Sequence, residues 1–550
     1  MKAKRKSNFI MQGSILAAAG IISRIIGMAR RFPMEHIIGD KGNGFYGVAY
    51  EVYAMMLIIS CYSLPLAVSK VVSSKMSKKQ YKSAERAFRC AMIFAVVAGG
   101  LTFCVCEVFG DFLAADVMDE PMSAMALKVL GPALLIVSVM GVLRGYFQGL
   151  GTMVPTAVSQ ILEQIFVLIG SIAGAYVLFG YGDKVGALLH NEDFAPAYGA
   201  AGASLGPVIG SAIGLIFLLF VFSVYRKGMS NLDMKKQSMR DVSQKTDSYG
   251  QIFRLILLTI FPVLLSTTVY NISNVLDIKI YNNVMVQKGL ADMKAYNVGV
   301  YSGKYRVLVN VPIALANAMC SSIVPVLTGL MMREEYTQAK DKIGQAMRFT
   351  MLVAIPSAVG LTVLARPIIS TLYRGEVDMA VNMLHIGSIS VVFYTMSTLT
   401  NGVLQGINKM KIPVRNALIA LVIHIAFLYL TLELGVGINA LVYANILFAV
   451  IVCVLNWLSI RKYLRYRQEC VKTFVIPAIA SIVMGIVIGI VSMLLSKFAG
   501  NVITMLLSII IGVVVYFVAM ILLKGINEYD LKKMPGGNIV LTVAKRFRLM

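Results

Sequence analysis

The feature that most limits how this chain can fold is a series of long apolar runs with very few charges. Residues 474–495 and 502–523 are two of them. About 20 apolar residues let an α-helix cross a bilayer, whereas a transmembrane β-strand needs only about 10 residues of alternating polarity. The runs do not alternate, and inside lipid only helices and closed barrels satisfy their backbone hydrogen bonds. The sequence therefore predicts an all-α integral membrane protein.

Composition supports this interpretation. Apolar residues make up 58% of the 550 residues and charged residues 14%, against about 45–50% and about 25% in soluble proteins. The mean hydropathy is +0.76. A soluble fold of this length has no use for so much apolar surface, so we expect lipid to be the solvent.

The net charge of +24 has two possible explanations, nucleic-acid binding or membrane topology. Lys and Arg gather in short stretches between apolar runs, which is typical of the cytoplasmic loops of membrane proteins. No basic stripe is interleaved with aromatic residues, so we expect no nucleic-acid partner. The basic stretches are residues 75–82, 226–245, 461–472 and 524–548.

Hydropathy and charge together predict 14 spans with both termini in the cytoplasm. The amino terminus is basic, and a signal peptide is the competing interpretation. The first apolar run continues past Ala17–Ala19 and through Arg24, which is too long and too charged for a signal peptide. The segments that this topology places inside hold most of the Lys and Arg. The predicted spans are 9–32, 45–70, 87–112, 123–148, 154–179, 199–225, 251–283, 298–329, 347–372, 378–405, 412–433, 437–460, 473–495 and 500–523.

Two sequence echoes predict an internal repeat. Gly145-x-x-Gln148-Gly149 returns as a Gly-x-x-Gln-Gly segment at 402–406, an offset of 257 residues. Tyr81-x-x-Ala84 returns at 336–339, an offset of 255. Spans 1–6 would thus repeat as spans 7–12 in the same orientation, an architecture in which transporters place the substrate path between halves. The predicted organisation is an N-lobe at 1–225, a cytoplasmic linker at 226–250, a C-lobe at 251–460, two further spans within 473–523, and a basic cytoplasmic tail at 524–550.

Ionisable residues at membrane depth are the candidates for function, because each costs about 2.5–3.5 kcal/mol or more there. The first span carries Arg24, Arg30 and Arg31, and the eighth begins with Lys304 and Arg306. The other candidates at this depth are Glu51, Arg144, Glu163, Asp277 and Lys279.

The sign of these charges favours an anionic substrate. Arg suits phosphate because its guanidinium is always charged and binds in a bidentate fork, so a diphosphate on a lipid carrier fits. A competing interpretation is that Arg30 and Arg31 reach the membrane interface as long side chains. Glu51 and Glu163 fit two roles equally well, cation or proton sites and partners of the arginines.

Motifs for enzyme chemistry are not evident in the sequence. The four histidines are far apart without an HExxH pattern, there is no Walker loop, and the seven cysteines are scattered as small apolar fillers. We therefore expect no catalytic site, no metal and no cofactor. A membrane glycosyltransferase is the alternative from another class, and Asp183, Glu192 and Asp193 are the only outward carboxylates that it could use.

Several motifs resemble those of one transporter family. Ser23–Gly27 (SRIIG) resembles the S-R-x-x-G motif of the MurJ lipid II flippases. The segment GFYGVAYEVY at 44–53, followed by PLAVSK at 65–70, is similar to the YtgP/SpoVB branch of Gram-positive bacteria. The two Gln-Gly segments are similar to polysaccharide exporters of the same multidrug/oligosaccharidyl-lipid/polysaccharide exporter superfamily. The resemblance extends over nearly the whole chain.

The resemblance implies a fold, a cargo and a set of binding residues. It implies two six-helix lobes around a central cavity with alternating access, plus two carboxyl-terminal helices. It implies that undecaprenyl-diphosphate-linked peptidoglycan precursor, lipid II, moves from the inner to the outer leaflet. Arg24 and Arg30 match two cavity arginines of the family, and Lys304 or Arg306 matches a basic residue early in the eighth helix. Gly44 and Leu57-Ile58 stand where Gram-negative members have an aspartate and an arginine pair, so those two functions do not carry over.

The resulting hypothesis is a lipid II flippase in the bacterial plasma membrane. Its substrate-binding residues would be Arg24, Arg30, Lys304 and Arg306, with further cavity charge from Glu51, Arg144 and Glu163. Expected partners are the lipid-linked glycan diphosphate, membrane lipids and cell-wall synthesis proteins. The alternatives are an exporter of another lipid-linked glycan, of sporulation or capsule type, and a cation-coupled drug antiporter.

Overall fold

The computed structural model describes residues 2–61, 63–228, 247–498 and 500–526, and in these ranges every regular element is a helix. The predicted all-α class is confirmed. The chain divides into two compact units, Met1–Gly303 and Lys304–Met550. The predicted linker at 226–250 and tail at 524–550 lie mostly outside the described residues.

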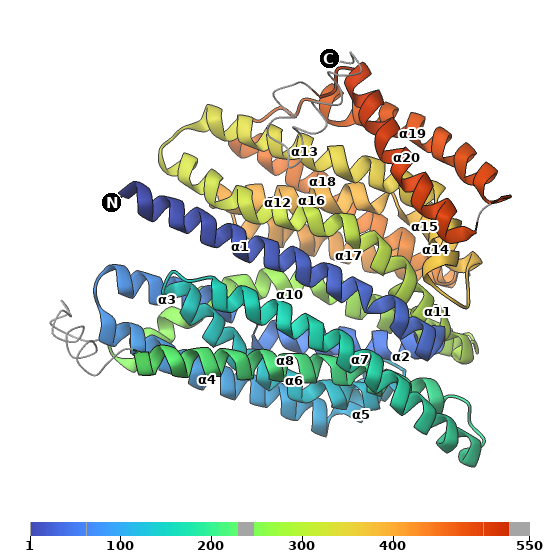
Figure 1. The fold of residues 1–550 in the computed structure, drawn as a ribbon, viewed down its shortest axis with the longest axis horizontal. Coiled ribbons are helices and arrows are strands. Elements are labelled where there is room, and N and C mark those ends of the chain that lie inside the picture. Colours follow the sequence, from blue (N-terminus) through green and yellow to red (C-terminus); the bar gives the residue numbers. More distant parts are fainter. Residues whose placement is uncertain (1, 62, 229–246, 499, 527–550) are drawn as a thin grey trace. The chain divides into compact units, whose positions relative to one another are not determined.

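The first unit is built from long apolar helices (Figure 1). Its elements are α1 (Lys2–Ala29), α2 (Arg31–Ser60), α3 (Leu64–Ser77), α4 (Tyr81–Val108), α5 (Gly110–Phe112), a π-turn η1 (Leu113–Val117), a 3-10 turn η2 (Pro121–Ser123), α6 (Ala124–Gly149), α7 (Val154–Leu189), α8 (Phe194–Gly228), α10 (Tyr249–Gln287) and α11 (Ala291–Gly299).

The second unit continues from the π-turn η3 (Val300–Tyr305), which crosses the division between the units. Its other elements are α12 (Arg306–Met332), α13 (Tyr336–Val363), α14 (Ala365–Leu372), α15 (Asp378–Gly387), α16 (Ser390–Gly406), α17 (Lys411–Glu433), α18 (Asn439–Leu464), the π-turn η4 (Val471–Val475), α19 (Ile476–Leu495) and α20 (Asn501–Leu522).

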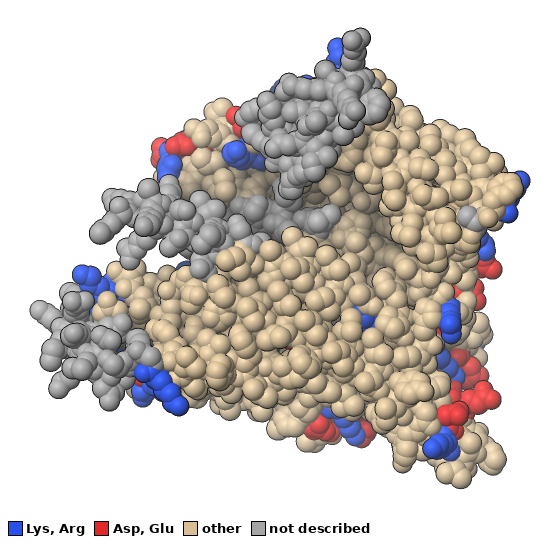
Figure 2. Space-filling view, viewed as in Figure 1, with Lys and Arg blue, Asp and Glu red and all other residues tan. Residues whose placement is uncertain are grey.

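Membrane-spanning length is confirmed for most of the predicted spans, but not the count of 14. In the described residues, ten segments are long and apolar enough to cross a bilayer, or eleven if the bent pair α15 and α16 is one span. Each predicted span overlaps a helix of the structure. On the face of the first unit that Figure 2 shows, long stretches carry no charge, and Lys and Arg lie mostly near helix ends.

The predicted span 45–70 comprises parts of two helices. Helix α2 ends at Ser60, and Cys61 leaves helical geometry with a φ of −142°. Pro65 stands in the first turn of α3, where its missing N–H costs nothing. Inside an unbroken helix Pro65 would lose its hydrogen bond to the carbonyl of Cys61 and clash with it, which favours the start of a new helix here.

Small residues let helices approach closely in the first unit. Gly174 of α7 and Gly202 of α8 face each other, and a Cβ on either would overlap the other's backbone. Likewise Gly44 of α2 lies against Ala295 of α11. In lipid, where apolar side chains gain little by leaving the solvent, such backbone contacts stabilise helix pairs through van der Waals packing.

The predicted repeat is visible in the packing of each unit. Helices α4 and α13 both have 28 residues and begin 255 positions apart. Ala91 lies in an apolar cluster with Val72 of α3, and Ala346 lies in a separate cluster with Leu327 of α12. Both pairs differ by 255 in number. The equivalent helices therefore bury equivalent faces, each within its own unit.

The division between the units does not fall at the predicted linker. Helix α10, which the predicted lobes place in the second half, packs on α2, α3 and α4 and belongs to the first compact unit. Ile252, Ile256 and Ile260 of α10 enter the apolar cluster of α3 and α4. The assignment of this helix to a moving lobe stays a prediction.

Candidate functional site

Arg30 and Arg31 lie at the junction of α1 and α2 in the first unit, and Arg24 lies six residues before Arg30 on α1. Arg24 is exposed on α1. Arg30 is 7% exposed, and its Nη1 donates a hydrogen bond to Ser171 Oγ of α7 at 2.9 Å. Because this hydrogen bond uses one donor of the five on the guanidinium, Arg30 keeps donors for a ligand.

Aromatic rings hold the third arginine beside the other two. The Arg31 guanidinium lies 5.4 Å from the ring centroid of Tyr46 and 5.8 Å from that of Tyr50. Arg30 approaches the Tyr46 ring from 5.9 Å, and the two rings stack at 5.7 Å. Each cation–π contact contributes about 0.5–2 kcal/mol, more when water is excluded. The ring pair therefore keeps two positive charges at membrane depth without a carboxylate in these contacts. Glu51, the residue after Tyr50, is half-buried.

Polar atoms without hydrogen bonds lie close to these arginines. Arg30 Nε, Ser23 Oγ and Gln160 Oε1 are buried and make no hydrogen bond within the described part of the chain. A Cβ on Gly27 would lie 3.1 Å from Gln164 Oε1 of α7. Buried polar groups normally have partners, so orphaned ones at such a site mark a place that a ligand or water can occupy. The interface of α1 and α7 is thus polar inside the span.

Arg144 and Glu163 pair with each other. Arg144 Nη2 lies 2.8 Å from Glu163 Oε2, and the two side chains are 12% and 18% exposed. Arg144 Nε also donates to Ser159 Oγ at 3.0 Å. Of the two roles predicted for Glu163, this geometry fits the partner of an arginine. It leaves little of either charge for a ligand.

The two basic candidates of the second unit differ sharply in their surroundings. The Lys304 side chain is fully buried, and its Nζ donates to the carbonyl oxygens of Arg374 at 2.6 Å and Glu376 at 2.9 Å. Its charge therefore holds the connection between α14 and α15. Arg306 begins α12 and is half-buried.

An apolar groove lies in the second unit, lined by α12, α13, α14, α19 and α20. Its volume is about 590 Å³, and Pro312, Pro356, Met484 and Gly512 are among the lining residues. Tyr516 on its wall donates from its hydroxyl to Leu352 O at 2.9 Å. With that hydroxyl satisfied, the wall presents carbon, which suits a hydrocarbon chain.

The sequence-predicted residues fall into three groups. Arg24 and Arg30 lie near the same junction of the first unit, together with the unpredicted Tyr46, Tyr50 and Ser171. Arg144 pairs with Glu163, and Lys304 binds backbone. No group of three or more His, Cys, Asp or Glu side chains suited to a metal occurs among the residues described. Tyr46 and Tyr50 stand four residues apart, a spacing from which a shared helix face follows. Ser171 is distant in sequence, so its role needed the fold.

Comparisons with known proteins agree on the family. The model of polysaccharide biosynthesis proteins matches residues 10–331, and the MatE model matches residues 293–430. Lipid II flippase MurJ of Bacillus subtilis (strain 168) is 26% identical over 505 residues, covering 90% of both chains. Stage V sporulation protein B of the same organism is 23% identical over 533 residues, covering 96% of this chain and 98% of its own length.

A solved structure agrees on the fold. Lipid II flippase MurJ in an inward closed conformation aligns with a TM-score of 0.62 at 17% identity, covering 92% of this chain and 97% of that one. The chain belongs to the polysaccharide biosynthesis protein family, as a MurJ- and SpoVB-like member of the multidrug/oligosaccharidyl-lipid/polysaccharide exporter superfamily.

Proposed function

We propose that this protein is a flippase for lipid II, the undecaprenyl-diphosphate-linked precursor of peptidoglycan. The observation that carries the proposal is the arginine cluster at the junction of α1 and α2. It places Arg30 and Arg31 at membrane depth on a hydroxyl and two rings, beside orphaned polar atoms. Arg30 uses one of its five guanidinium donors on Ser171, and an anionic ligand that enters the membrane with its lipid would accept hydrogen bonds from the others.

The proposed roles follow from the surroundings of each residue. Arg24 is exposed and would meet the diphosphate first. Arg30, fixed by Ser171, would bind it from a set position. In the second unit Arg306 is the better candidate than Lys304, because Lys304 donates hydrogen bonds to the backbone carbonyls of Arg374 and Glu376. Glu51 would balance the arginines when the site is empty.

The apolar groove of the second unit supports a lipid cargo. A polyprenyl chain cannot cross the bilayer in a polar cavity, and a carbon-lined groove of about 590 Å³ gives it a place along α19 and α20. The drug-antiporter alternative offers no use for a cluster of arginines, since a cationic drug would be repelled by it. The arginine cluster and the apolar groove are also our reasons to infer a transporter and not an enzyme.

One other cargo has a specific observation in its favour. Stage V sporulation protein B is similar over nearly the full length of both chains. A second lipid-linked glycan would use the same diphosphate contacts, since the glycan differs and the carrier does not. Both cargoes require a plasma-membrane protein, and we propose cytoplasmic termini and contacts with cell-wall synthesis proteins for either.

Depletion in the host tests the proposal. With no redundant flippase present, loss of the protein should leave lipid II in the inner leaflet, measured by its access to an external probe. A copy with Arg24→Ala should fail to restore outward lipid II, while Arg366→Gln should restore it, because Arg366 forms only an exposed ion pair with Asp378. Normal outward movement after depletion would overturn the assignment.

A further inference from the structure

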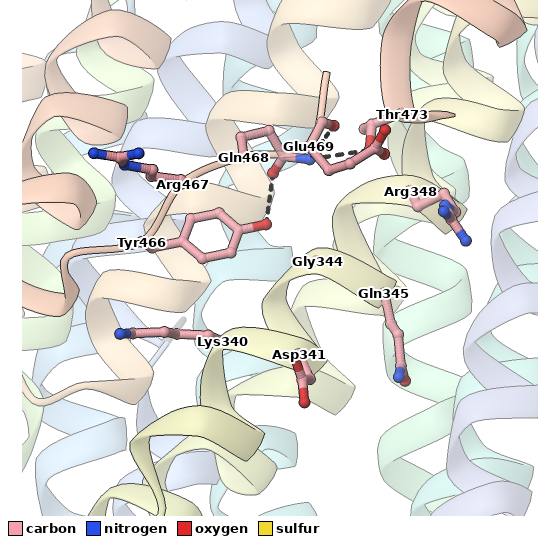
Figure 3. Close-up of a pocket in the computed structure, with 10 residues that line it drawn as sticks. All are labelled: Lys340, Asp341, Gly344, Gln345, Arg348, Tyr466, Arg467, Gln468, Glu469 and Thr473. Carbon is pink, nitrogen blue, oxygen red and sulfur yellow. Dashed lines mark hydrogen bonds between the residues drawn. The ribbon is translucent and has the colours of Figure 1, made fainter. Parts of the chain in front are cut away.

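A polar pocket lies on the second unit and shares no lining residue with the apolar groove. The start of α13 forms one wall, and the chain between α18 and η4 forms the other (Figure 3). Its volume is about 410 Å³. Because α13 begins and α18 ends at this place, the pocket lies at the ends of membrane spans.

Hydrogen bonds fix the wall that the connecting chain supplies. Tyr466 is buried, and its hydroxyl donates to Gln468 Oε1 at 2.8 Å. Gln468 Nε2 in turn donates to Thr473 Oγ1 at 3.0 Å. A Cβ on Gly344 would lie 3.3 Å from the Tyr466 hydroxyl. The glycine therefore leaves space on the helix face that the wall covers.

Three cations line this space. Lys340 and Arg348 stand four residues to either side of Gly344, on one face of α13. Figure 3 shows Lys340 and Arg467 extending in the same direction on either side of the Tyr466 ring, and Arg348 on the other side of Gly344. The cations therefore surround the opening from both walls.

The carboxylates of the pocket do not cancel this charge. Glu469 Oε1 accepts a hydrogen bond from Lys472 N at 2.7 Å, and Oε2 accepts from Thr473 Oγ1 at 3.4 Å. These two hydrogen bonds hold the Glu469 carboxylate at the first turn of η4. Asp341 is exposed at the rim. Two carboxylates against three cations leave the pocket with a net positive charge.

The repeat-related position in the first unit is occupied by an ion pair. Arg89 stands 255 residues before Gly344, and Glu85 stands 255 before Lys340. Arg89 Nη2 lies 2.8 Å from Glu85 Oε1, and Arg226 Nη2 lies 3.3 Å from the same oxygen. The first unit thus carries an arginine engaged in an ion pair where the second carries a glycine beside an open pocket.

We propose that this pocket binds a phosphate-bearing anion through Lys340, Arg348 and Arg467. Arginine pairs with phosphate in a bidentate fork and lysine as a point charge, so the set suits a phosphate ester. The ester can come from the headgroup of an anionic phospholipid or from a soluble metabolite. This site goes beyond the proposed flippase activity, because it lies at the start of α13 and none of the cargo-binding arginines lines it.

The test uses the purified full chain with two probes. Glycerol phosphate is titrated by calorimetry against protein in neutral detergent, and retention of phosphatidylglycerol is measured by native mass spectrometry after reconstitution in mixed phosphatidylglycerol and phosphatidylcholine nanodiscs. Lys340→Gln with Arg467→Gln should weaken binding of the recognised probe at least about tenfold, since two charge-assisted contacts are lost. Arg89→Gln, the matched change in the first unit, should change it less than about twofold.

The Gly344→Arg variant distinguishes binding in the pocket from a general attraction of the probe to positive charge. This substitution copies the first unit and adds a cation, so binding by net charge alone would strengthen. Binding in the pocket would weaken, because the new side chain occupies it. Binding of glycerol phosphate in detergent identifies a soluble ligand, and retention of phosphatidylglycerol alone identifies the lipid; both support the site. Equal binding by the double variant and Arg89→Gln, or binding of neither probe by the unaltered chain, would overturn it. Lipid II transport is measured in a separate assay, and its outcome does not decide whether this pocket binds a phosphate ester.

Discussion

In the first unit, Arg144 of α6 donates to Ser159 and pairs with Glu163, both on α7. The residues 257 positions later, Asn401 of α16 and Asn416 of α17, stand at the related place in the second unit. There, Asn456 Nδ2 donates to Asn401 Oδ1 at 2.7 Å, and Asn416 Nδ2 donates to Asn456 Oδ1 at 2.9 Å. One unit joins its helices with an ion pair and the other with neutral amides.

A related difference occurs at the repeat position of Glu51. The residue 255 positions later is Arg306, although Tyr46 and Tyr50 return as Tyr301 and Tyr305. The apolar and aromatic framework is thus kept between the units, while the sign of the polar side chains changes. Packing requires similar shapes at equivalent positions, whereas a path for one anion needs different charges on its two sides. We infer that the framework serves the fold and the differences serve transport.

The largest predicted effect tests the shared framework. Gly44 and Gly299 are repeat-related by 255 positions, and a Cβ on either would overlap backbone, of Ala295 and of Asp40 respectively. Gly44→Ala and Gly299→Ala should each destabilise the fold by about 3 kcal/mol or more. The yield of monodisperse protein on size exclusion measures this. Gly100→Ala is the control, because no atom lies within 4 Å of its added Cβ. Full yield from either variant would show that the close contact between α2 and α11 is not required.

The next effect tests the ion pair of the first unit. Glu163→Ala leaves Arg144 at 12% exposure without its carboxylate, which should cost about 3 kcal/mol. Adding Arg144→Asn and Ser159→Asn to Glu163→Ala gives a triple variant that copies the second unit, where Ala420 stands at the position related to Glu163. The triple variant should regain part of the loss in thermal unfolding in detergent. If the triple variant is no more stable than Glu163→Ala alone, the amide contacts of the second unit cannot replace the ion pair of the first.

A smaller effect is expected from the amides of the second unit. Asn456→Ala removes the donor to Asn401 and the acceptor for Asn416, which should cost about 2 kcal/mol because two buried amides lose their partner. Thermal unfolding again measures it. Asn456→Asp, of nearly the same shape, keeps the acceptor and should cost less at low pH than at neutral pH. A loss of stability as large as that of Glu163→Ala would contradict the idea that the neutral amide contacts stabilise the helices less than the ion pair does.

The smallest effect concerns a loop of the first unit. Burial raises the pKa of Glu120 to about 7, against the opposing charge of Lys294. Its Oε2 lies 3.7 Å from Lys294 Nζ. The unfolded chain loses this proton at its ordinary pKa, while the folded chain keeps it, so stability should fall as pH rises from about 4.5 to 7. In Glu120→Gln this part of the pH dependence should vanish. The related connection of the second unit is held by hydrogen bonds from Lys304 to backbone carbonyls, which do not titrate, and these bonds should add no such trend.

Much of the fold followed from sequence because hydropathy is a local property. Each predicted span overlaps a helix, and the echoes at Gln148 and Tyr81 located the repeat. The break at Cys61 was not predicted, although Pro65 was visible, because proline alone does not distinguish a bend from a new helix.

The site was harder to predict because its partners are distant in sequence. Nothing near Arg30 indicates Ser171, which lies 141 residues away. Lys304 and Arg306 are equally plausible by composition, and only the fold shows that Lys304 holds the connection after α14. Spacing along a helix reveals neighbours on one element, whereas pairing between elements depends on how the helices pack.

The central claim is that arginines of the α1–α2 junction carry a lipid-linked diphosphate. Its most direct test is the initial rate of lipid II translocation in proteoliposomes containing the purified protein. The account predicts that Arg24→Ala and Arg30→Ala each lower this rate at least about tenfold, equivalent to about 1.4 kcal/mol, while Arg366→Gln stays within about twofold of the unaltered protein. Equal rates for Arg24→Ala, Arg30→Ala and the unaltered protein would contradict it.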